Sequence, residues 1–297
     1  MRYYPEDDTE GGTAALAEFL AAHGNVLVLT GAGLSTASGI PDYRDKDGVR
    51  RGRAPIQGPD FRRSDAVRRR YWARSLLGWP TLSGAAPNPG HLALAAMEQS
   101  GNIGHVITQN VDGLHQRAGS QRLIELHGNI HHVVCLACQA RYARADIQQR
   151  LLDDNPHLHR AEQEVKALPD GDAQVEPEAL EQFNIPHCDR CAGVLQPDVV
   201  FFGDNIPAER TQAALQAMEQ ADALLVVGSS LMVFSGFRFC RLAAQAGKPI
   251  AAINAGVTRA DELIGLKVAA AAQVVLPRLA ENYCISIERT MPSLASA

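Results

Sequence analysis

Four short runs of apolar residues, rich in β-branched side chains, occur along the chain, and each has the length of one strand. They cover Asn25–Thr30, Val106–Gln109, Ala223–Gly228 and Pro249–Asn254. None of them alternates between apolar and polar positions, which is typical of strands buried on both faces of a parallel sheet.

The segments between these runs have helical spacing. Thr13 to His23 places its apolar side chains on one face and stops at Gly24, where a glycine commonly ends a helix. Further helices are predicted from Asn88 to Met97, from Pro207 to Met218 and from Phe234 to Ala246. Because strands alternate with helices, the pattern predicts an α/β fold built on a Rossmann-like, doubly wound parallel sheet.

Two cysteine pairs, Cys135-x2-Cys138 and Cys188-x2-Cys191, have the spacing of a tetrahedral zinc ribbon. Residues 139–187 separate the pairs, which is more than the usual spacing, so a loop must leave the ribbon between them. Four thiolates saturate zinc and leave no position for a water, so the predicted zinc is structural.

Two segments interrupt the alternation of strands and helices: 45–87, rich in Arg, Pro and Gly, and 129–195, which holds both cysteine pairs. We therefore expect a single unit over 1–297, with a smaller zinc-ribbon and helical part inserted into the large domain. The expected parts are a Rossmann-like large domain (13–44, 88–128 and 196–284), a helical insertion (45–87), a zinc-binding small module (129–195) and a C-terminal tail (285–297).

Composition narrows the class of protein. Hydrophobic residues make up 46% and charged residues 21%, and the net charge is −5, so nothing points to a specific nucleic-acid partner. No apolar stretch approaches the roughly 20 residues that a membrane span needs. Since the N-terminal residues are acidic and resemble no signal or presequence, a cytoplasmic protein is expected.

Gly31-Ala32-Gly33 directly follows the first predicted strand, where glycines let a backbone approach a pyrophosphate. A tight turn without a ligand explains this pattern equally well. Thr36 stands where a dehydrogenase fingerprint has its third glycine, and no acidic residue marks the end of a second strand. The pattern therefore favours nucleotide binding but argues against ordinary hydride transfer.

Polar residues also end the second clear strand, at Gln109-Asn110-Val111-Asp112, where an α/β fold places its ligands. His127 follows, just before the first cysteine pair. A histidine with an ordinary pKa of about 6.5 at such a cleft is the usual general base, although a lone histidine is more often structural.

Taken together, these segments resemble the sirtuins, NAD-dependent protein lysine deacylases, from about residue 13 to about residue 284. The resemblance is carried by Gly31–Arg44, Thr108–Asp112, Leu126–Gly128, both cysteine pairs, Pro197–Asp204 and Val227–Leu231. A further cluster is similar to the class II branch, which contains the mitochondrial sirtuin four type: Arg70–Arg74, Gly78–Pro80, Val233–Phe239 and Asn254–Arg259.

The resemblance implies two cofactors, NAD and one structural Zn²⁺, and a set of site residues. The implied zinc ligands are Cys135, Cys138, Cys188 and Cys191. The implied catalytic residues are His127 as the base, with Asn110 and Asp112. The implied NAD contacts are Gly31, Ala32, Gly33, Ser35, Ile40, Pro41, Asp42, Tyr43, Arg44, Gln109, Asn110, Val111, Asp112, Gly228, Ser229, Ser230, Asn254, Ala255, Gly256 and Ala272.

The implied partner is an acyl-lysine protein, bound as an added strand between two edges of the molecule. The expected peptide contacts are Val199, Phe201, Gly203, Leu231 and Val233. Tyr71 and Arg74, i and i+3 on a helix, are expected to meet an acidic acyl group. The alternative is that Tyr71 and Trp72 pack the small module while Arg74 is solvated.

Two other functions stay open at this stage. A mono-ADP-ribosyltransferase would use the same NAD pocket but pass ADP-ribose to a protein. A zinc-ribbon interaction protein would carry an inactive nucleotide fold, and the set Gln109, Asn110, Asp112 and His127 argues against it. The sequence leaves the oligomeric state open and is compatible with a monomer.

Overall fold

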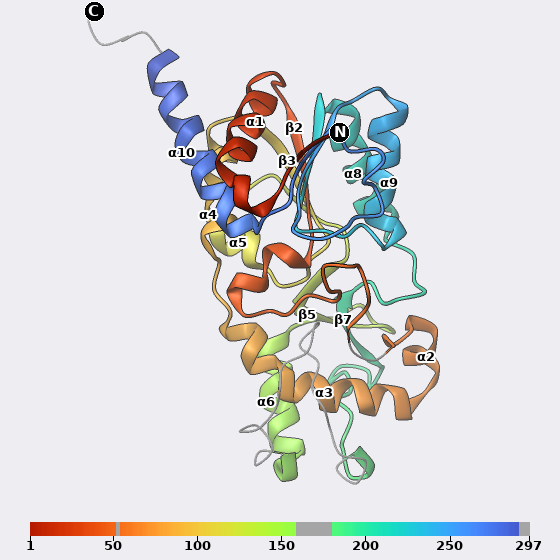
Figure 1. The fold of residues 1–297 in the computed structure, drawn as a ribbon. Coiled ribbons are helices and arrows are strands. Elements are labelled where there is room, and N and C mark those ends of the chain that lie inside the picture. The colour runs from red at the N-terminus through yellow and green to blue at the C-terminus, as the bar shows by residue number, and fades with distance from the viewer. Residues whose placement is uncertain (52–53, 159–179, 291–297) are drawn as a thin grey trace, which may run out of the picture.

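The computed structural model describes residues 1–51, 54–158 and 180–290. Within these residues the main element is a seven-stranded parallel sheet with the strand order β1-β10-β9-β8-β2-β3-β4 (Figure 1). In chain order its strands are β1 (Arg2–Tyr4), β2 (Val26–Thr30), β3 (Ile103–Thr108), β4 (Leu123–Glu125), β8 (Ala223–Val227), β9 (Ile250–Ile253) and β10 (Leu266–Val268).

Helices cover both faces of this sheet, because its central strands are apolar on both sides. Val26 and Val28 of β2 point into one core, and Leu27 and Leu29 point into the other. The first core is closed by α1 (Thr9–Ala21), α4 (Pro89–Gln99) and α10 (Ala272–Thr290), and the second by α8 (Ala208–Gln220) and α9 (Phe234–Gln245). The doubly wound Rossmann-like fold is thus confirmed.

The four apolar runs form β2, β3, β8 and β9, and the four predicted helices form α1, α4, α8 and α9 with ends shifted by a few residues. The sheet also contains β1, β4 and β10, of three residues each, which the pattern did not predict. Since β1 pairs with β10, the sheet begins at Arg2, upstream of the expected start at residue 13. At the other end α10 continues to Thr290, into the expected tail 285–297, of which 291–297 lie outside the described residues.

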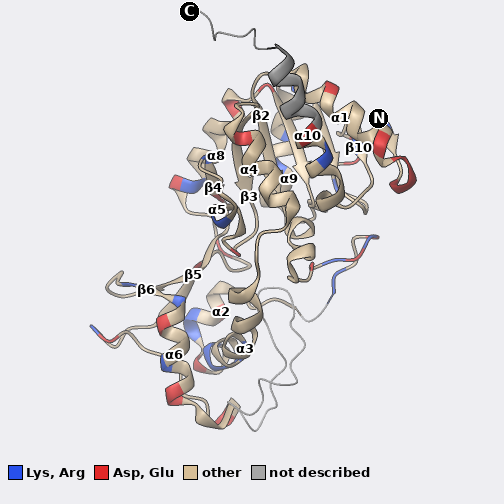
Figure 2. Ribbon diagram, turned by 90° about the vertical axis from the view of Figure 1, so that its left-hand side faces the viewer, with Lys and Arg blue, Asp and Glu red and all other residues tan. Residues whose placement is uncertain are grey.

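A smaller part lies at one end of the molecule, away from most of the large sheet (Figures 1 and 2). Its described residues form the antiparallel sheet β6-β5-β7, from β5 (Gly128–Cys135), β6 (Arg141–Ala143) and β7 (Leu195–Val199). The helices α2 (Gly58–Arg63), α3 (Asp65–Gly84) and α6 (Arg144–Asp154) pack with it. Phe61, Trp72 and Leu76 share one core with Val133 and Ile147, so the described parts of the segments 45–87 and 129–195 fold together.

A proline inside α3 ties this helix to α6. Pro80 has no N–H, so the carbonyl of Leu76 cannot receive its normal helical hydrogen bond. The side chain of Gln148 in α6 donates to that carbonyl at 3.0 Å, and Arg144, one turn earlier, donates to the carbonyl of Ser75 at 3.1 Å. Arg144 also lies over the ring of Trp79, at 4.6 Å from its centroid. Side chains of α6 therefore support α3 where the proline has removed a hydrogen bond from that helix.

The remaining short elements are the 3-10 turns η1 (Glu6–Asp8), η2 (Ala32–Leu34) and η3 (Thr36–Ser38) and the helix α5 (Leu114–Ala118). Over the described part of the chain, no helix combines the length and apolarity needed to cross a bilayer.

Candidate active site

One large cavity, of about 650 Å³, lies at the carboxyl ends of the central strands, between the large sheet and the small part. Loops that follow β2, β3, β8 and β9 border it on one side, and residues of α3 and of the segment after β7 border it on the other. The edge where parallel strands end is the general ligand site of open α/β sheets.

Most of the residues expected to contact NAD line this cavity. They are Gly31, Ala32, Gly33, Asp42, Tyr43, Arg44, Gln109, Asn110, Val111, Gly228, Ser229, Ser230, Asn254, Ala255, Gly256 and Ala272. Ser35 and Asp112 are not on its surface but are buried close beneath it, and Ile40 and Pro41 do not border it.

The glycine turn after β2 packs directly against the turn after β8. The N–H of Gly33 donates to the carbonyl of Gly228 at 2.8 Å, and a Cβ added to Gly33 would lie 2.9 Å from that oxygen. Gly228 has a φ of 58°, a backbone conformation that favours glycine. After this turn the chain forms η2 and η3, two 3-10 turns, instead of the long helix that follows a dehydrogenase fingerprint. The departure seen at Thr36 thus corresponds to a different local structure.

Amide side chains from the end of β3 connect the loops around the cavity. Gln109 donates to the carbonyl of Thr30 at 3.2 Å and to the hydroxyl of Ser229 at 2.9 Å. Asn110 donates to the carbonyl of Gly31 and to the hydroxyl of Ser35, both at 3.1 Å. These hydrogen bonds connect the carboxyl ends of β2, β3 and β8 and fix the spacing between them.

His127 lies on the cavity wall between two polar partners. Its Nδ1 is 2.9 Å from the carbonyl oxygen of Gln109, and its Nε2 is 2.8 Å from the hydroxyl of Ser235. Burial lowers the pKa of the imidazole below its ordinary value, against the hydrogen bond that the ring donates to the carbonyl of Gln109, which raises it. The ring is therefore neutral near pH 7 and has a lone pair available for a proton.

A pair of buried histidines, not predicted from the sequence, lies beside the end of β2, where Nε2 of His115 is 3.0 Å from the hydroxyl of Thr30. His91 of α4 and His115 of α5 are fully buried with ring centroids 5.1 Å apart. Burial lowers the pKa of His91 to about 4 and that of His115 to about 3, so both are uncharged at neutral pH. The sequence offers one local indication for His91 alone: it stands three residues after Asn88, and the two form the capping box of α4.

The family model for the Sir2 family matches residues 31–235, which include the glycine turn, His127 and Ser235. NAD-dependent protein deacetylase 3 of Pseudomonas syringae pv. tomato is 51% identical over 262 residues, 88% of this chain and 92% of that protein. The NAD-dependent protein deacetylase of Xanthomonas campestris pv. campestris (strain 8004) is 52% identical over 254 residues, 86% of each chain. This chain belongs to the Sir2 family, the sirtuins.

Solved Sir2 structures have the same fold as this sirtuin. A Sir2 complex with a p53 peptide and NAD⁺ superposes with a TM-score of 0.72 and 29% identity, over 91% of this chain and 98% of that one. A Sir2 complex with a deacetylated p53 peptide and 3′-O-acetyl ADP-ribose gives 0.74 and 28%, with the same coverage. The membership in class II stays a prediction.

The residues expected around the peptide and acyl group also border the sirtuin's cavity: Tyr71, Arg74, Val199, Phe201, Gly203, Leu231 and Val233. Tyr71 packs edge-on against Phe61 and Phe201, at centroid distances of 5.3 and 5.4 Å. Arg74 is only 8% exposed, so the alternative of a solvated Arg74 is wrong, although Tyr71 does pack the small part. Leu231 has a φ of 57°, an unusual conformation for a leucine, at the entrance to α9.

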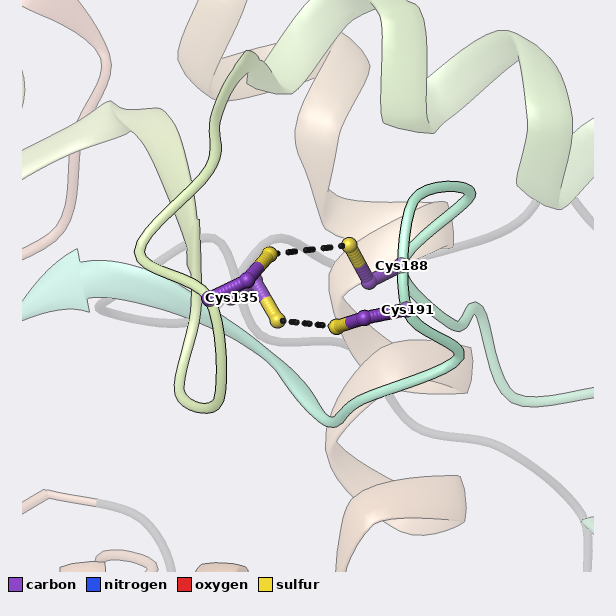
Figure 3. Close-up of side chains that lie close together, drawn as sticks. Cys135, Cys188 and Cys191 are labelled. Atoms are coloured by element: carbon purple, nitrogen blue, oxygen red, sulfur yellow. Dashed lines mark hydrogen bonds between the residues drawn. The ribbon is translucent and has the colours of Figure 1, made fainter.

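The four predicted zinc ligands of the sirtuin lie together in the small part (Figure 3). Their sulfur atoms are all within 4.8 Å of one another, with Cys135–Cys191 at 3.5 Å and Cys138–Cys188 at 3.6 Å. Four sulfurs at about 2.3 Å from a tetrahedral zinc lie about 3.8 Å apart, so this arrangement fits one zinc ion.

Both cysteine pairs sit on turns of the same form. The N–H of Gln139 donates to the carbonyl of Cys135, and that of Ala192 donates to the carbonyl of Cys188. Gln139 and Ala192 each have a positive φ, of 59° and 57°. Two matched turns therefore present the four thiolates from opposite sides.

Several cavity residues were not predicted as site residues. Arg50 and Arg51, in the Arg-rich segment 45–87, both border the cavity. Ser75 and Ser235 border it as well, and nothing local in their sequence distinguishes them from other helical serines.

Proposed function

We propose that this sirtuin is an NAD-dependent protein lysine deacylase that uses His127 as its general base. The observation that carries the proposal is the placement of a neutral, doubly hydrogen-bonded imidazole on the wall of the cavity that the glycine turns also border. Its relatives from Pseudomonas and Xanthomonas are named NAD-dependent protein deacetylases.

NAD would be held by the loops after β2, β3, β8 and β9. Gly31, Gly33 and Gly228 have no side chain, because an added Cβ would collide with the opposing turn. Their bare backbone can therefore approach a pyrophosphate closely. Gln109 and Asn110 offer amide groups to the nicotinamide half, and Asn254–Gly256 lie toward the far end of the cavity. When bound, NAD supplies an electrophilic ribose carbon that the acyl oxygen of the substrate lysine attacks as nicotinamide leaves.

The protein's own side chains contribute a negative charge near the ribose and a base that accepts a proton. Asp112 places a carboxylate beneath the cavity floor, where a negative charge stabilises developing positive charge on the ribose. His127 then accepts the proton of a ribose hydroxyl on Nε2, a step worth about 10²–10⁴ in rate for a general base. With one water consumed to release the amine, the products are free lysine, nicotinamide and O-acyl-ADP-ribose.

The acylated peptide would bind as a strand between the segment after β7 and the segment before α9. The N–H of Val200 donates to the carbonyl of His127 at 2.8 Å, so the first edge is fixed next to the base. Phe202, after β7, and Val233, before α9, are exposed apolar side chains at 36% and 40% that border the cavity. Backbone pairing reads little of the peptide sequence, so we expect a broad range of protein substrates.

Tyr71 and Arg74 give the acyl end of the cavity a polar character. Arg74 is buried and borders the cavity, and a guanidinium can bind a carboxylate through two parallel hydrogen bonds. We therefore propose acyl groups with a terminal carboxylate, such as succinyl and glutaryl, as preferred substrates.

Mass spectrometry of an acyl-lysine peptide panel tests the function. Wild-type protein is incubated with NAD and without it, beside His127→Ala and the control His132→Ala, a histidine exposed on β5. We expect free lysine and O-acyl-ADP-ribose only with NAD, near-complete loss in His127→Ala and full activity in His132→Ala. ADP-ribose on protein without deacylation would instead indicate a mono-ADP-ribosyltransferase.

A further inference from the structure

Ser235 is the second residue of α9 and borders the same cavity as His127. Its hydroxyl oxygen lies 2.8 Å from Nε2 of His127, although the two residues are 108 positions apart in the chain. The nitrogen that Ser235 contacts is the one that faces the substrate in the proposed function.

The direction of this hydrogen bond follows from the other side of the ring. A backbone carbonyl only accepts, so Nδ1 of His127 must donate its hydrogen to the carbonyl of Gln109. In a neutral imidazole the second nitrogen is then an acceptor, and burial keeps this ring neutral. Ser235 is therefore the donor, and its O–H occupies the lone pair that a substrate hydroxyl needs.

The position of Ser235 is fixed by the residue that holds the ring from behind. Gly236 follows Ser235 and lies against the side chain of Gln109, where an added Cβ would be 2.3 Å from Oε1. Gln109 is itself anchored to Thr30 and Ser229. The first turn of α9 and the end of β3 thus hold the imidazole between them.

We propose that Ser235 is a positioning residue for the general base, an inference that rests on the proposed deacylase function. In the resting protein its O–H donates to Nε2 and keeps the lone pair directed at the cavity. When the substrate arrives, a ribose hydroxyl replaces this donor: its O–H bond breaks, an N–H bond forms on Nε2, and the ribose oxygen keeps the electron pair for its attack. The Ser235 oxygen then accepts a hydrogen bond from the new Nε2–H, which keeps the charged ring in place.

The kinetic test separates the step that needs the base from the step that does not. Exchange of labelled nicotinamide into NAD requires departure and return of nicotinamide, which precede proton removal by His127. We expect Ser235→Ala to lower kcat for deacylation by about two- to tenfold, the rate equivalent of one hydrogen bond, with nicotinamide exchange unchanged. Ser235→Thr retains the hydroxyl and should restore kcat, and Ser100→Ala, an exposed serine at the end of α4, is the control.

A second measurement needs no activity. In protein labelled with nitrogen-15 histidine, the Nε2 resonance of His127, assigned by its loss in His127→Ala, reports the hydrogen bond directly. We expect it to move toward the value of an unbonded nitrogen in Ser235→Ala and to return in Ser235→Thr.

The outcomes distinguish this inference from the function on which it rests. A wild-type protein that consumes no NAD would refute the deacylase function and with it the role in proton transfer, while the resonance would still decide the contact. An unchanged kcat, an equal loss of exchange and deacylation, or an unmoved Nε2 resonance in Ser235→Ala would overturn the role of Ser235.

Discussion

The hydroxyl of Ser35 donates a hydrogen bond of 2.7 Å to the carboxylate of Asp112, beneath the floor of the cavity. The other carboxylate oxygen accepts from the N–H of Leu114 at 3.0 Å. The neighbouring His91 and His115 are uncharged, so they do not neutralise this carboxylate. The site therefore has an oriented negative charge below the position proposed for the ribose.

Loss of the Ser35 hydroxyl should slow the cleavage of NAD. A hydrogen bond to a charged group is worth about 1.5–3 kcal/mol, so we expect Ser35→Ala to reduce nicotinamide exchange by about 10- to 100-fold. Asp112→Asn, which removes the charge, should reduce it at least as much. The control is Ser83→Ala, whose hydroxyl donates to the carbonyl of Pro80 in α3. An exchange rate in Ser35→Ala equal to that of wild type would show that the carboxylate needs no such support.

The acyl preference should depend on Arg74. We expect wild-type protein to favour succinyl- and glutaryl-lysine peptides over acetyl-lysine, and Arg74→Ala to lower this ratio of kcat/KM by about 10- to 100-fold. Arg74→Lys keeps the charge but loses the paired donors, so its ratio should be intermediate. Arg70→Ala, an exposed arginine of the same helix, should leave the ratio unchanged. A constant ratio in all three variants would exclude a carboxylate-binding role for Arg74.

The stability of the protein should fall as the pH falls below about 6.5, because of His91 and His115. In the unfolded chain each takes up a proton near pH 6.5, whereas in the native protein the pKa values are about 4 and about 3. Between these values the unfolded state binds more protons, so acid favours unfolding by about 1.4 kcal/mol per pH unit for each histidine. Urea unfolding from pH 7 to pH 4.5 measures this slope.

The matched variants for this slope are His115→Gln and His132→Gln. His115→Gln should remove about half of the pH dependence of the unfolding free energy that the two buried histidines cause. This holds whatever the effect of the substitution on stability at pH 7. The second changes an exposed histidine and should leave the slope as in wild type. Equal slopes for wild type and His115→Gln would contradict the assignment.

Removal of zinc should inactivate the enzyme indirectly. Cys188→Ser, or treatment with a strong chelator, should release the metal and loosen α6, which supports α3 through Arg144 and Gln148. We expect metal analysis to find one zinc in wild type and none in Cys188→Ser, with a lower melting temperature and reduced deacylation. His187→Ala, an exposed neighbour of the ligands, should keep the zinc and the activity.

The sequence predicted an element well where its residue pattern has a single physical explanation. The runs that form β2 and β8 are buried at every position, so their continuous apolar character identified them as central strands. The three-residue strands β1 and β4 have no fully buried position, and so short an exposed segment has no periodicity to detect. The cysteine spacing predicted the metal cluster because few other arrangements require it.

The sequence indicated which residues gather around the cavity, but not which of them border it and which lie buried beneath it. The motif Gln109–Asp112 suggested four equivalent cavity residues, yet Asp112 lies underneath and accepts a hydrogen bond from Ser35. Ser235 was not predicted, because its partner His127 is brought to it only by the packing of α9 against the end of β3. Contacts of this kind depend on tertiary structure and leave no local signal.

Pro80 limits which segments of this protein can be replaced by those of another protein. The carbonyl of Leu76 has lost its helical donor to the proline and depends on Gln148, which belongs to a segment far along the chain. A chimera that takes the zinc-binding segment from another protein would need a donor at this same place, or an unpaired carbonyl would remain under the wall that holds Tyr71 and Arg74. Acyl preference in this enzyme is therefore expected to be inherited with both segments together, and transplanting either one alone should alter it.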